Sequence, residues 1–273
     1  MAGAIDLDAY FSRVGYAGEP RPTLETLSRL HALHAEAIAF ENLSAFIGEE
    51  IALDAASLQR KLVASGRGGW CFEQNLLFAH VLREIGFELV TLSARVRWNA
   101  PPGALRPRSH MLLLVNLPEG RHVADVGFGG LTLTAPLRFE ANIVQSTPHE
   151  EFRLIQEAPG FYLQEANVAG AWQALYAFDL QEQHVADYEV SNWYLAHHPQ
   201  SHFVTGVIAA RSEPGLRHAL RGDRYTIHRK GGESESRAIG SVDEFRRILA
   251  GPLRIALPDT PELDRRLATL LAR

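Results

Sequence analysis

The sequence has 273 residues, enough for one large domain or two to three small ones with a substantial core. Hydrophobic residues make up 46% and charged residues 22%, a composition typical of a soluble globular protein. The formal net charge of −5 argues against a nucleic-acid partner, which would normally face a basic surface. No apolar run approaches the roughly 18 residues that cross a membrane, so no membrane partner is expected.

The N-terminus and the cysteine content indicate a compartment. The first residues bring acidic side chains early and show no apolar core of a secretory signal. A single cysteine excludes an internal disulfide framework. We therefore expect a cytoplasmic protein, and the sequence leaves its oligomeric state open.

Residues 5–86 predict helices. In 24–40, leucines recur every three residues, and Thr23 is placed to serve as the N-cap. Thr26 is neither acid nor amide, so a plain cap is expected and not a capping box. Further helices are predicted over 7–16, 57–65 and 71–87, the last ending at Gly86.

The pattern changes over 87–180, where short β-rich runs alternate with turn residues. This spacing predicts an antiparallel sheet or barrel. The predicted strands are 87–98, 110–117, 122–128, 151–158, 161–166 and 172–178.

The last third mixes both kinds of element. A helix is predicted over 187–199 and closing helices over 241–250 and 260–272, capped by Ser241 and Thr260. Strands are predicted over 202–210, 224–230 and 236–240, with a hairpin turn at 230–234. Helices, then strands, then a mixed segment predict an α+β fold of about three units.

Several common catalytic motifs are missing from the sequence. It contains no GxxxxGK[ST], no GxSxG and no GxGxxG. With one cysteine and no HExxH, we expect no metal site.

Cys71 is the candidate nucleophile, although a lone cysteine is usually a small apolar core residue. The glycine-rich segment 66–69 leads directly into the helix that Cys71 begins. A thiolate at a helix N-terminus meets unpaired N–H groups and the positive end of the dipole. The same N–H groups, that of Cys71 included, could stabilise an oxyanion. Gly68 and Gly69 permit a tight approach that larger residues would block.

A base and a group that orients it are required next. His110 begins an apolar strand, where a buried polar side chain is expected to have a hydrogen-bond partner. If 110–117 and 121–126 form a hairpin, the start of the first lies beside the end of the second, which makes His110 and Asp125 neighbours. The order Cys, His, Asp is that of papain-like and transglutaminase-like thiol enzymes. The glycine cluster that follows, 127–130, is either a simple turn or a set of N–H groups for a phosphate or acyl carbonyl.

These segments resemble the arylamine N-acetyltransferase family. "RGGWCFEQN" at 67–75 fits the family's RGGxCxExN signature, while "SH" at 109–110 and "DVGFG" at 125–129 fit its other two catalytic segments. "IAFENL" at 38–43 is similar to the family's IPFENL, with Ala39 in place of proline, and 191–204 is similar to the approach to its third domain.

The resemblance implies a helical bundle carrying the cysteine over 1–86, a β-barrel carrying His and Asp over 87–186, and an α/β lid over 187–273. It also implies that these units together form a cysteine-protease-like catalytic core. It implies acetyl-CoA as co-substrate, no tightly bound cofactor, and an arylamine, arylhydrazine or N-hydroxyarylamine as acceptor. The choices between acyl-CoA donors and between detoxification and biosynthesis stay open.

The resemblance also implies roles for individual residues. The catalytic residues are Cys71, His110 and Asp125. Candidate contacts to CoA are Ser109, Gly127, Gly129 and Gly130. Candidate walls for the aromatic acceptor, which could equally be core residues, are Phe40, Val96, Phe128 and Phe203. Arg67 and Glu73 are expected to be buried, paired charges that fix the Cys71 loop.

Three alternatives accompany this interpretation. An amide synthase would close macrolactams with the same triad and an acyl carrier protein as donor. A transglutaminase-like thiol hydrolase would use water or lysine as acceptor and would have no use for CoA. A non-catalytic binding module would be expected to lose a member of the triad, whereas all three are present.

Overall fold

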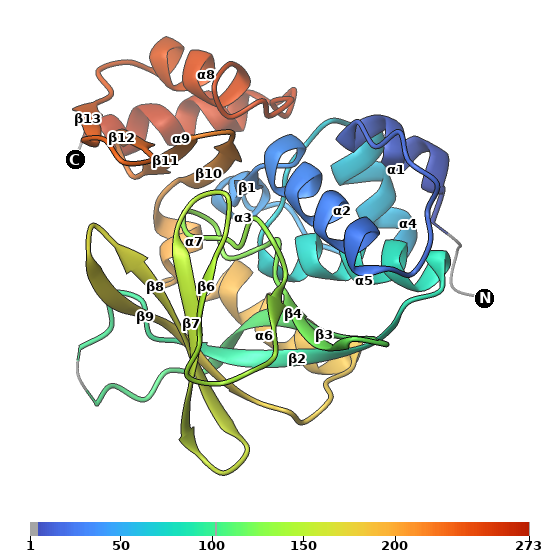
Figure 1. Ribbon diagram of the computed structural model, residues 1–273. Coiled ribbons are helices and arrows are strands. Elements are labelled where there is room, and N and C mark those ends of the chain that lie inside the picture. The colour runs from blue at the N-terminus through green and yellow to red at the C-terminus, as the bar shows by residue number, and fades with distance from the viewer. Residues whose placement is uncertain (1–4, 102, 273) are drawn as a thin grey trace.

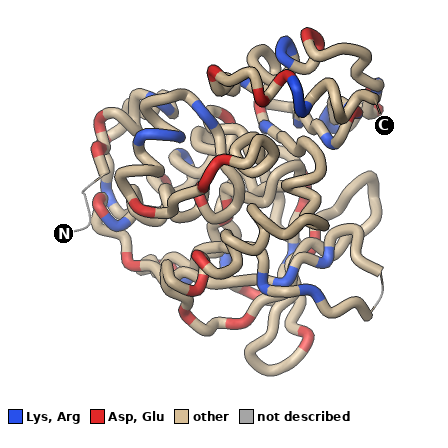
Figure 2. The backbone as a smooth tube through the Cα atoms, turned by 180° about the vertical axis from the view of Figure 1, so that it is seen from behind, with Lys and Arg blue, Asp and Glu red and all other residues tan. Residues whose placement is uncertain are grey.

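The computed structural model describes residues 5–101 and 103–272. The first four residues of the predicted helical unit and the last residue of the predicted lid lie outside this description. The chain passes from helices through a strongly curved antiparallel sheet to a mixed unit, so the predicted α+β class and barrel are confirmed (Figure 1). Acidic and basic residues are interspersed along all three parts (Figure 2).

The N-terminal part is helical. Its elements are α1 (Leu7–Val14), α2 (Leu24–Ala37), α3 (Leu43–Ile47), α4 (Ala55–Leu58), a π-helix (Gln59–Ala64) and α5 (Cys71–Ile85). The hydroxyl of Thr23 accepts the N–H of Thr26 at 3.3 Å, which is the predicted plain cap. α5 ends at Gly86, whose φ of 102° lies in the region that favours glycine. Within the described part of the chain, no helix is both long and apolar enough to span a bilayer.

The barrel strands run antiparallel in the order β5-β4-β3-β2-β9-β8-β7-β6. They are β2 (Glu88–Val96), β3 (Arg108–Leu117), β4 (Gly120–Ala124), β5 (Leu137–Arg138), β6 (Val144–Ser146), β7 (Glu151–Ala158), β8 (Phe161–Val168) and β9 (Ala171–Asp179). Five of the six longer strands match the predicted ones closely. The predicted strand 122–128 is wrong in its second half, because β4 ends at Ala124 and the Asp125 carboxylate accepts the Gly127 N–H in the turn that follows. The two short strands, β5 and β6, were not predicted.

One side chain joins the two edge strands of this sheet. The Gln145 amide on β6 accepts the Arg138 N–H at 2.8 Å and donates to the Arg138 carbonyl at 2.9 Å. It therefore satisfies backbone groups of β5 that a neighbouring strand would otherwise pair. Leucines and aromatic residues fill the interior, among them Leu112, Leu114 and Phe152.

The C-terminal unit contains a second sheet, of order β1-β10-β11-β12-β13, with helices before and after its strands in the chain. Its elements are α6 (Val185–His197), α7 (His202–Thr205), β10 (Ile208–Glu213), β11 (Leu216–Arg221), β12 (Arg224–Arg229), β13 (Glu235–Ala238), α8 (Val242–Ala250) and α9 (Pro261–Leu271). Ser241 and Thr260 cap α8 and α9 as predicted.

Two predictions for this unit need correction. The predicted strand 202–210 is wrong in its first half, because the Ser201 hydroxyl accepts the Phe203 N–H and begins α7. The strand starts only at Ile208, after Gly206 has ended the helix. The strand β11 was missed, since its charged and apolar residues mix without clear alternation.

The strand β1 (Phe40–Glu41) connects distant parts of the chain. Phe40 pairs with Ala210 of β10, and the Glu41 N–H donates to the Gly69 carbonyl at 3.1 Å. Asn42 follows with hydrogen bonds to the Phe203 carbonyl and to other backbone groups at the start of β10. The C-terminal sheet is thereby fastened to the segment that leads into α5.

Candidate active site

Cys71 is the first residue of α5, as predicted. Trp70 has extended backbone geometry, and its N–H donates to the Glu73 carboxylate at 3.1 Å. Cys71 is only 6% exposed. It lies at the N-terminal end of the helix, where the first N–H groups have no partner within the helix. The Cys71 side chain therefore lies at the positive end of the helix dipole.

Gly68 and Gly69 are required by close packing. A Cβ on Gly68 would lie 2.1 Å from the Ala39 carbonyl oxygen, and one on Gly69 would lie 2.7 Å from the Glu73 carboxylate. Both distances are shorter than atoms can approach. The predicted tight approach before the cysteine is confirmed.

Arg67 and Glu73 are buried and paired, as expected, and the structure adds their partners. The Arg67 guanidinium bonds Glu41 at 2.9 Å, and Lys61 donates to Glu73 at 2.6 Å. Burial alone would raise the pKa of Glu41, but Arg67 and Lys61 hold it below its usual value. Burial raises the pKa of Glu73 in spite of Lys61. These pairs fix the backbone on both sides of Cys71.

His110 and Asp125 form a buried pair, with 2.8 Å between Nε2 and Oδ2. The predicted hairpin is present: β3 pairs with β4, and Leu113 lies opposite Ala124. Asp125 follows one residue beyond that ladder. Its Oδ1 accepts the Gly127 N–H at 2.9 Å, so the carboxylate is held independently of the histidine.

The charges around His110 favour its protonated form. Burial would lower the pKa of this ring, but the Asp125 carboxylate and, to a smaller extent, the nearby Cys71 side chain raise it to about 10. In turn, His110 holds the pKa of Asp125 below its usual value against the effect of burial. Because Nε2 faces Asp125, Nδ1 is the ring nitrogen left for the thiol. The Cys71 sulfur also lies 3.6 Å from the Ser109 carbonyl oxygen.

The two polar residues after Glu73 support the site, and no role was predicted for them. The Asn75 amide donates to the Met111 carbonyl and to Asp125 Oδ1, and its oxygen accepts the Val126 N–H. α5 is thereby tied directly to the loop that carries the aspartate. The available signal was the run of three polar residues at 73–75, directly before four apolar residues of the same helix.

Gln74 anchors the opposite side of α5. Its amide donates to carbonyl oxygens before and within the glycine loop, including those of Ala39 and Gly69. Its oxygen lies 2.6 Å from His34 Nε2, and the other nitrogen of that ring meets the Tyr10 hydroxyl. These groups are all buried and position the first turn of the helix.

The structure changes the prediction for the glycine segment. The Gly127 N–H donates to Asp125, so it is not free for CoA, and a Cβ there would lie 2.9 Å from Cys71 Cα. Gly127 is therefore required for close packing. The Phe128 N–H likewise donates to the Thr132 hydroxyl. Gly129 turns with φ 82° beside the Phe40 ring, and a Cβ on Gly130 would meet open space.

The residues predicted to form walls for the aromatic acceptor lie in two groups. Phe128 meets the His110 ring edge-on at 5.1 Å, and Val96 pairs across the sheet with Tyr176, which also contacts His110. Phe40 and Phe203 contact each other at 6.3 Å between ring centroids. Gly129, beside Phe40, follows Phe128 directly and connects the two groups.

A helix-borne thiol facing a histidine and an aspartate is the arrangement of thiol enzymes that form a covalent acyl intermediate. A sequence model described as N-acetyltransferase matches residues 23–261. The arylamine N-acetyltransferase of Escherichia coli K12 is 42% identical over 93% of this chain and 90% of its own length. That of Mycolicibacterium smegmatis is 45% identical over 84% of each chain.

Solved structures agree with the sequence relatives. The arylamine N-acetyltransferase of Mycobacterium marinum in complex with CoA superposes with a TM-score of 0.93 at 38% identity, covering 97% of this chain and 99% of that one. This chain belongs to the arylamine N-acetyltransferase family, and it is an acyltransferase enzyme.

Proposed function

We propose that this chain transfers an acetyl group from acetyl-CoA to an arylamine, an arylhydrazine or an N-hydroxyarylamine by way of an acetyl-cysteine at Cys71. The observation that carries the proposal is the buried His110–Asp125 pair, 2.8 Å apart, beside the Cys71 side chain that begins α5. Family membership supports the donor and the acceptor class.

In the first half-reaction, the Cys71 thiolate attacks the thioester carbonyl of acetyl-CoA. N–H groups at the start of α5 are placed to stabilise the oxyanion that forms. The bond to the CoA sulfur then breaks, and the His110 imidazolium gives its proton to that sulfur. Free CoA leaves, and the acetyl group stays on Cys71.

In the second half-reaction, the amine nitrogen attacks the acetyl-cysteine carbonyl and neutral His110 accepts the proton of that nitrogen. Collapse of the intermediate releases the acetylated amine and restores the thiolate beside the imidazolium. Asp125 stabilises the positive ring at both stages and fixes its orientation. An arylamine suits this step because it is largely unprotonated near neutral pH.

The aromatic groups around His110 suit an aromatic acceptor. Phe128 meets the His110 ring, and Phe40 and Phe203 form an apolar contact next to Gly129. We assign these residues, with Val96, to the acceptor site. We assign Ser109, Gly129 and Gly130 to the CoA site, and Gly127 no longer belongs to that set.

The test is intact-mass spectrometry of the protein mixed with acetyl-CoA and no amine, beside Cys71→Ala. Because Cys71 is the single cysteine, a thioester adduct has one possible location. We expect one acetyl group on the wild type only, discharged by an arylamine such as anisidine. An adduct that arylamines leave in place would favour the amide synthase, and discharge by water alone would favour the hydrolase. No adduct with any acyl-CoA would overturn the proposal.

A further inference from the structure

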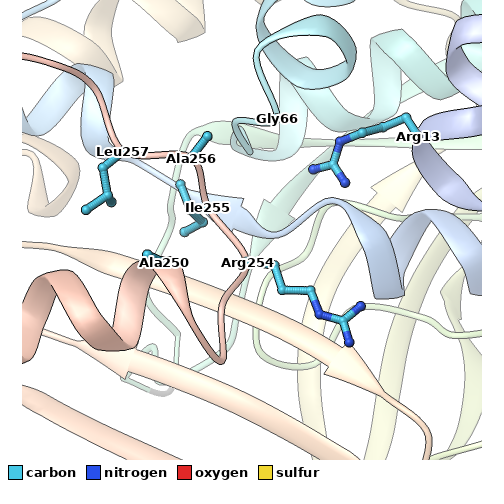
Figure 3. A pocket seen from close by; sticks show the side chains of 7 residues that line it. All are labelled: Arg13, Gly66, Ala250, Arg254, Ile255, Ala256 and Leu257. Carbon is cyan, nitrogen blue, oxygen red and sulfur yellow. The ribbon is translucent and has the colours of Figure 1, made fainter.

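A cleft apart from Cys71 holds two arginine side chains. It has a volume of about 600 Å³ and lies between α1, the loop at Gly66 and the segment that follows α8. Arg13 enters from α1 and Arg254 from the opposite side, and Ile255, Ala256 and Leu257 complete the wall (Figure 3). None of the residues assigned to catalysis or substrate binding lines this cleft.

Arg13 is half-buried and has spare donors. Its Nε donates to the Leu62 carbonyl at 3.1 Å, which fixes the side chain and leaves the terminal nitrogens toward the cleft. Within residues 5–101 and 103–272, no carboxylate forms an ion pair with it. Burial and the positive charge of Arg254 both lower the pKa of Arg13, so the two guanidinium groups repel each other across the cleft.

Arg254 is exposed, and its side chain makes no hydrogen bond or ion pair to any described residue. Its backbone has φ 53°, a conformation that residues other than glycine and asparagine rarely adopt. The chain around it is fixed, because the Ile255 and Ala256 N–H groups donate to the Leu249 and Gly66 carbonyls. The backbone that carries this exposed guanidinium is thus fixed at the edge of the cleft.

We propose that this cleft binds a phosphate dianion, with Arg13 and Arg254 as its two ligands. Two guanidinium forks offer paired N–H donors that match phosphate oxygens, and their joint charge of about +2 balances a phosphomonoester. The apolar wall at 255–257 would contact the organic part of a phosphorylated compound. The phosphate has two sources: a separate phosphorylated small molecule, or the phosphomonoester group of CoA itself.

The test is a ³¹P NMR titration with inorganic phosphate at low ionic strength, where charge interactions are least screened. We expect saturable one-to-one binding to the wild type. Arg254→Asn should weaken it about ten-fold or more, since it removes one charged pair of hydrogen bonds. Asparagine tolerates the backbone conformation of residue 254, so a loss of binding there would reflect the lost guanidinium.

The matched control is Arg247→Gln, an exposed arginine of α8 that does not line the cleft. It removes the same charge and should leave the affinity within about two-fold. A second variant, Arg13→Gln, should weaken binding like Arg254→Asn. If Arg13→Gln fails to fold, Arg254→Asn alone decides. Equal affinity in the wild type and Arg254→Asn, or no saturable binding in the wild type, would overturn the proposal.

The KM for acetyl-CoA separates the two sources of the phosphate. A KM raised in Arg254→Asn and unchanged in Arg247→Gln identifies the phosphomonoester of the substrate as the occupant. A KM unchanged in both variants, together with lost phosphate binding in Arg254→Asn, assigns the cleft to a separate phosphorylated compound.

Discussion

Two buried regions of this molecule place a histidine in opposite charge states. In the helical part, His34 meets the Tyr10 hydroxyl and the Gln74 amide, and burial lowers its pKa to about 3. On the barrel, His110 meets the Asp125 carboxylate, and its pKa rises to about 10 although burial acts against it. Burial alone gives a neutral structural histidine, and an adjacent carboxylate gives a charged one.

His31 shows how specific this rule is. It also contacts Asp125, but its Nε2 accepts a hydrogen bond from the Asp125 backbone N–H and makes none with the carboxylate. Burial lowers its pKa to about 4, and the more distant carboxylate charge only partly opposes that. Two histidines at the same aspartate therefore differ because one meets the side chain and the other the backbone.

The largest expected effect comes from Asp125→Asn, which removes the carboxylate and keeps its shape. The new amide would present N–H groups to His110 Nε2, so the ring would turn neutral and carry its proton on Nδ1. We expect kcat/KM for acetyl transfer to fall by about 10³–10⁴-fold, as when the orienting acid of such a triad is neutralised. Steady-state assays with acetyl-CoA and an arylamine measure this.

Two controls accompany that variant. NMR titration of His110 should give a pKa of about 10 in the wild type and a much lower one in Asp125→Asn, because the carboxylate is the strongest influence that opposes burial. Glu140→Gln removes an exposed carboxylate and should change kcat/KM by less than about two-fold. A His110 pKa unmoved by Asp125→Asn would contradict the electrostatic explanation.

The neutral histidines predict acid sensitivity. A histidine whose pKa is lowered by folding contributes stability above about pH 6.5, and that stability is lost as pH falls toward the folded value. His34→Gln should lower the free energy of unfolding at pH 7. Its deficit should then shrink by about 1.4 kcal/mol per pH unit between pH 6.5 and 4. Urea unfolding at several pH values tests this, and parallel pH profiles would refute it.

A smaller effect tests whether position matters as well as charge. Gly127→Ala would place a Cβ 2.9 Å from Cys71 Cα and push the aspartate loop away from α5. We expect a loss of about 1–3 kcal/mol in stability and a lower kcat. For stability, Gly130→Ala is the matched control, since a Cβ there meets open space. Similar melting temperatures for the two variants would show that the loop yields easily.

The smallest expected effect is that of Tyr10→Phe, which removes the hydroxyl facing His34 Nδ1. Leaving that buried nitrogen without a donor should cost about 1–2 kcal/mol in the free energy of unfolding. Activity should stay near that of the wild type, because Tyr10 contacts the structural His34 and not the catalytic His110. Chemical denaturation and steady-state kinetics decide the two points separately. A large loss of kcat without a loss of stability would mean that the two regions are coupled.

Much of this fold could be read from local patterns. The helix over 71–85 and the long barrel strands were predictable because their periodicity reflects which side faces a core. The short strands β5 and β6 were not, since two or three residues carry no period. α7 was mistaken for strand because Phe203 and Val204 have β-rich character, whereas the Ser201 cap decides the local structure.

The candidate site divides in the same way. Cys71, His110 and Asp125 follow from a helix start and a hairpin, both of which are local features. Their supports join residues far apart in the chain, such as Asn75 with Met111. No spacing in the sequence reveals that His34 is neutral or that Gly127 packs directly against the Cys71 backbone, since both depend on neighbours that are distant in the chain.

The two residues of β1 also make the molecule hard to divide. On one side of β1 the Glu41 N–H donates to the Gly69 carbonyl in the loop before Cys71, and on the other side Phe40 and Glu41 pair with β10. A fragment ending before Gly206 would expose this edge and strip Asn42 of its backbone partners at Gly206 and Ile208. Helices and barrel expressed without the last third should therefore lose the ordered entrance to α5. Adding the missing piece in trans should restore it, so fragment complementation would report directly on the nucleophile.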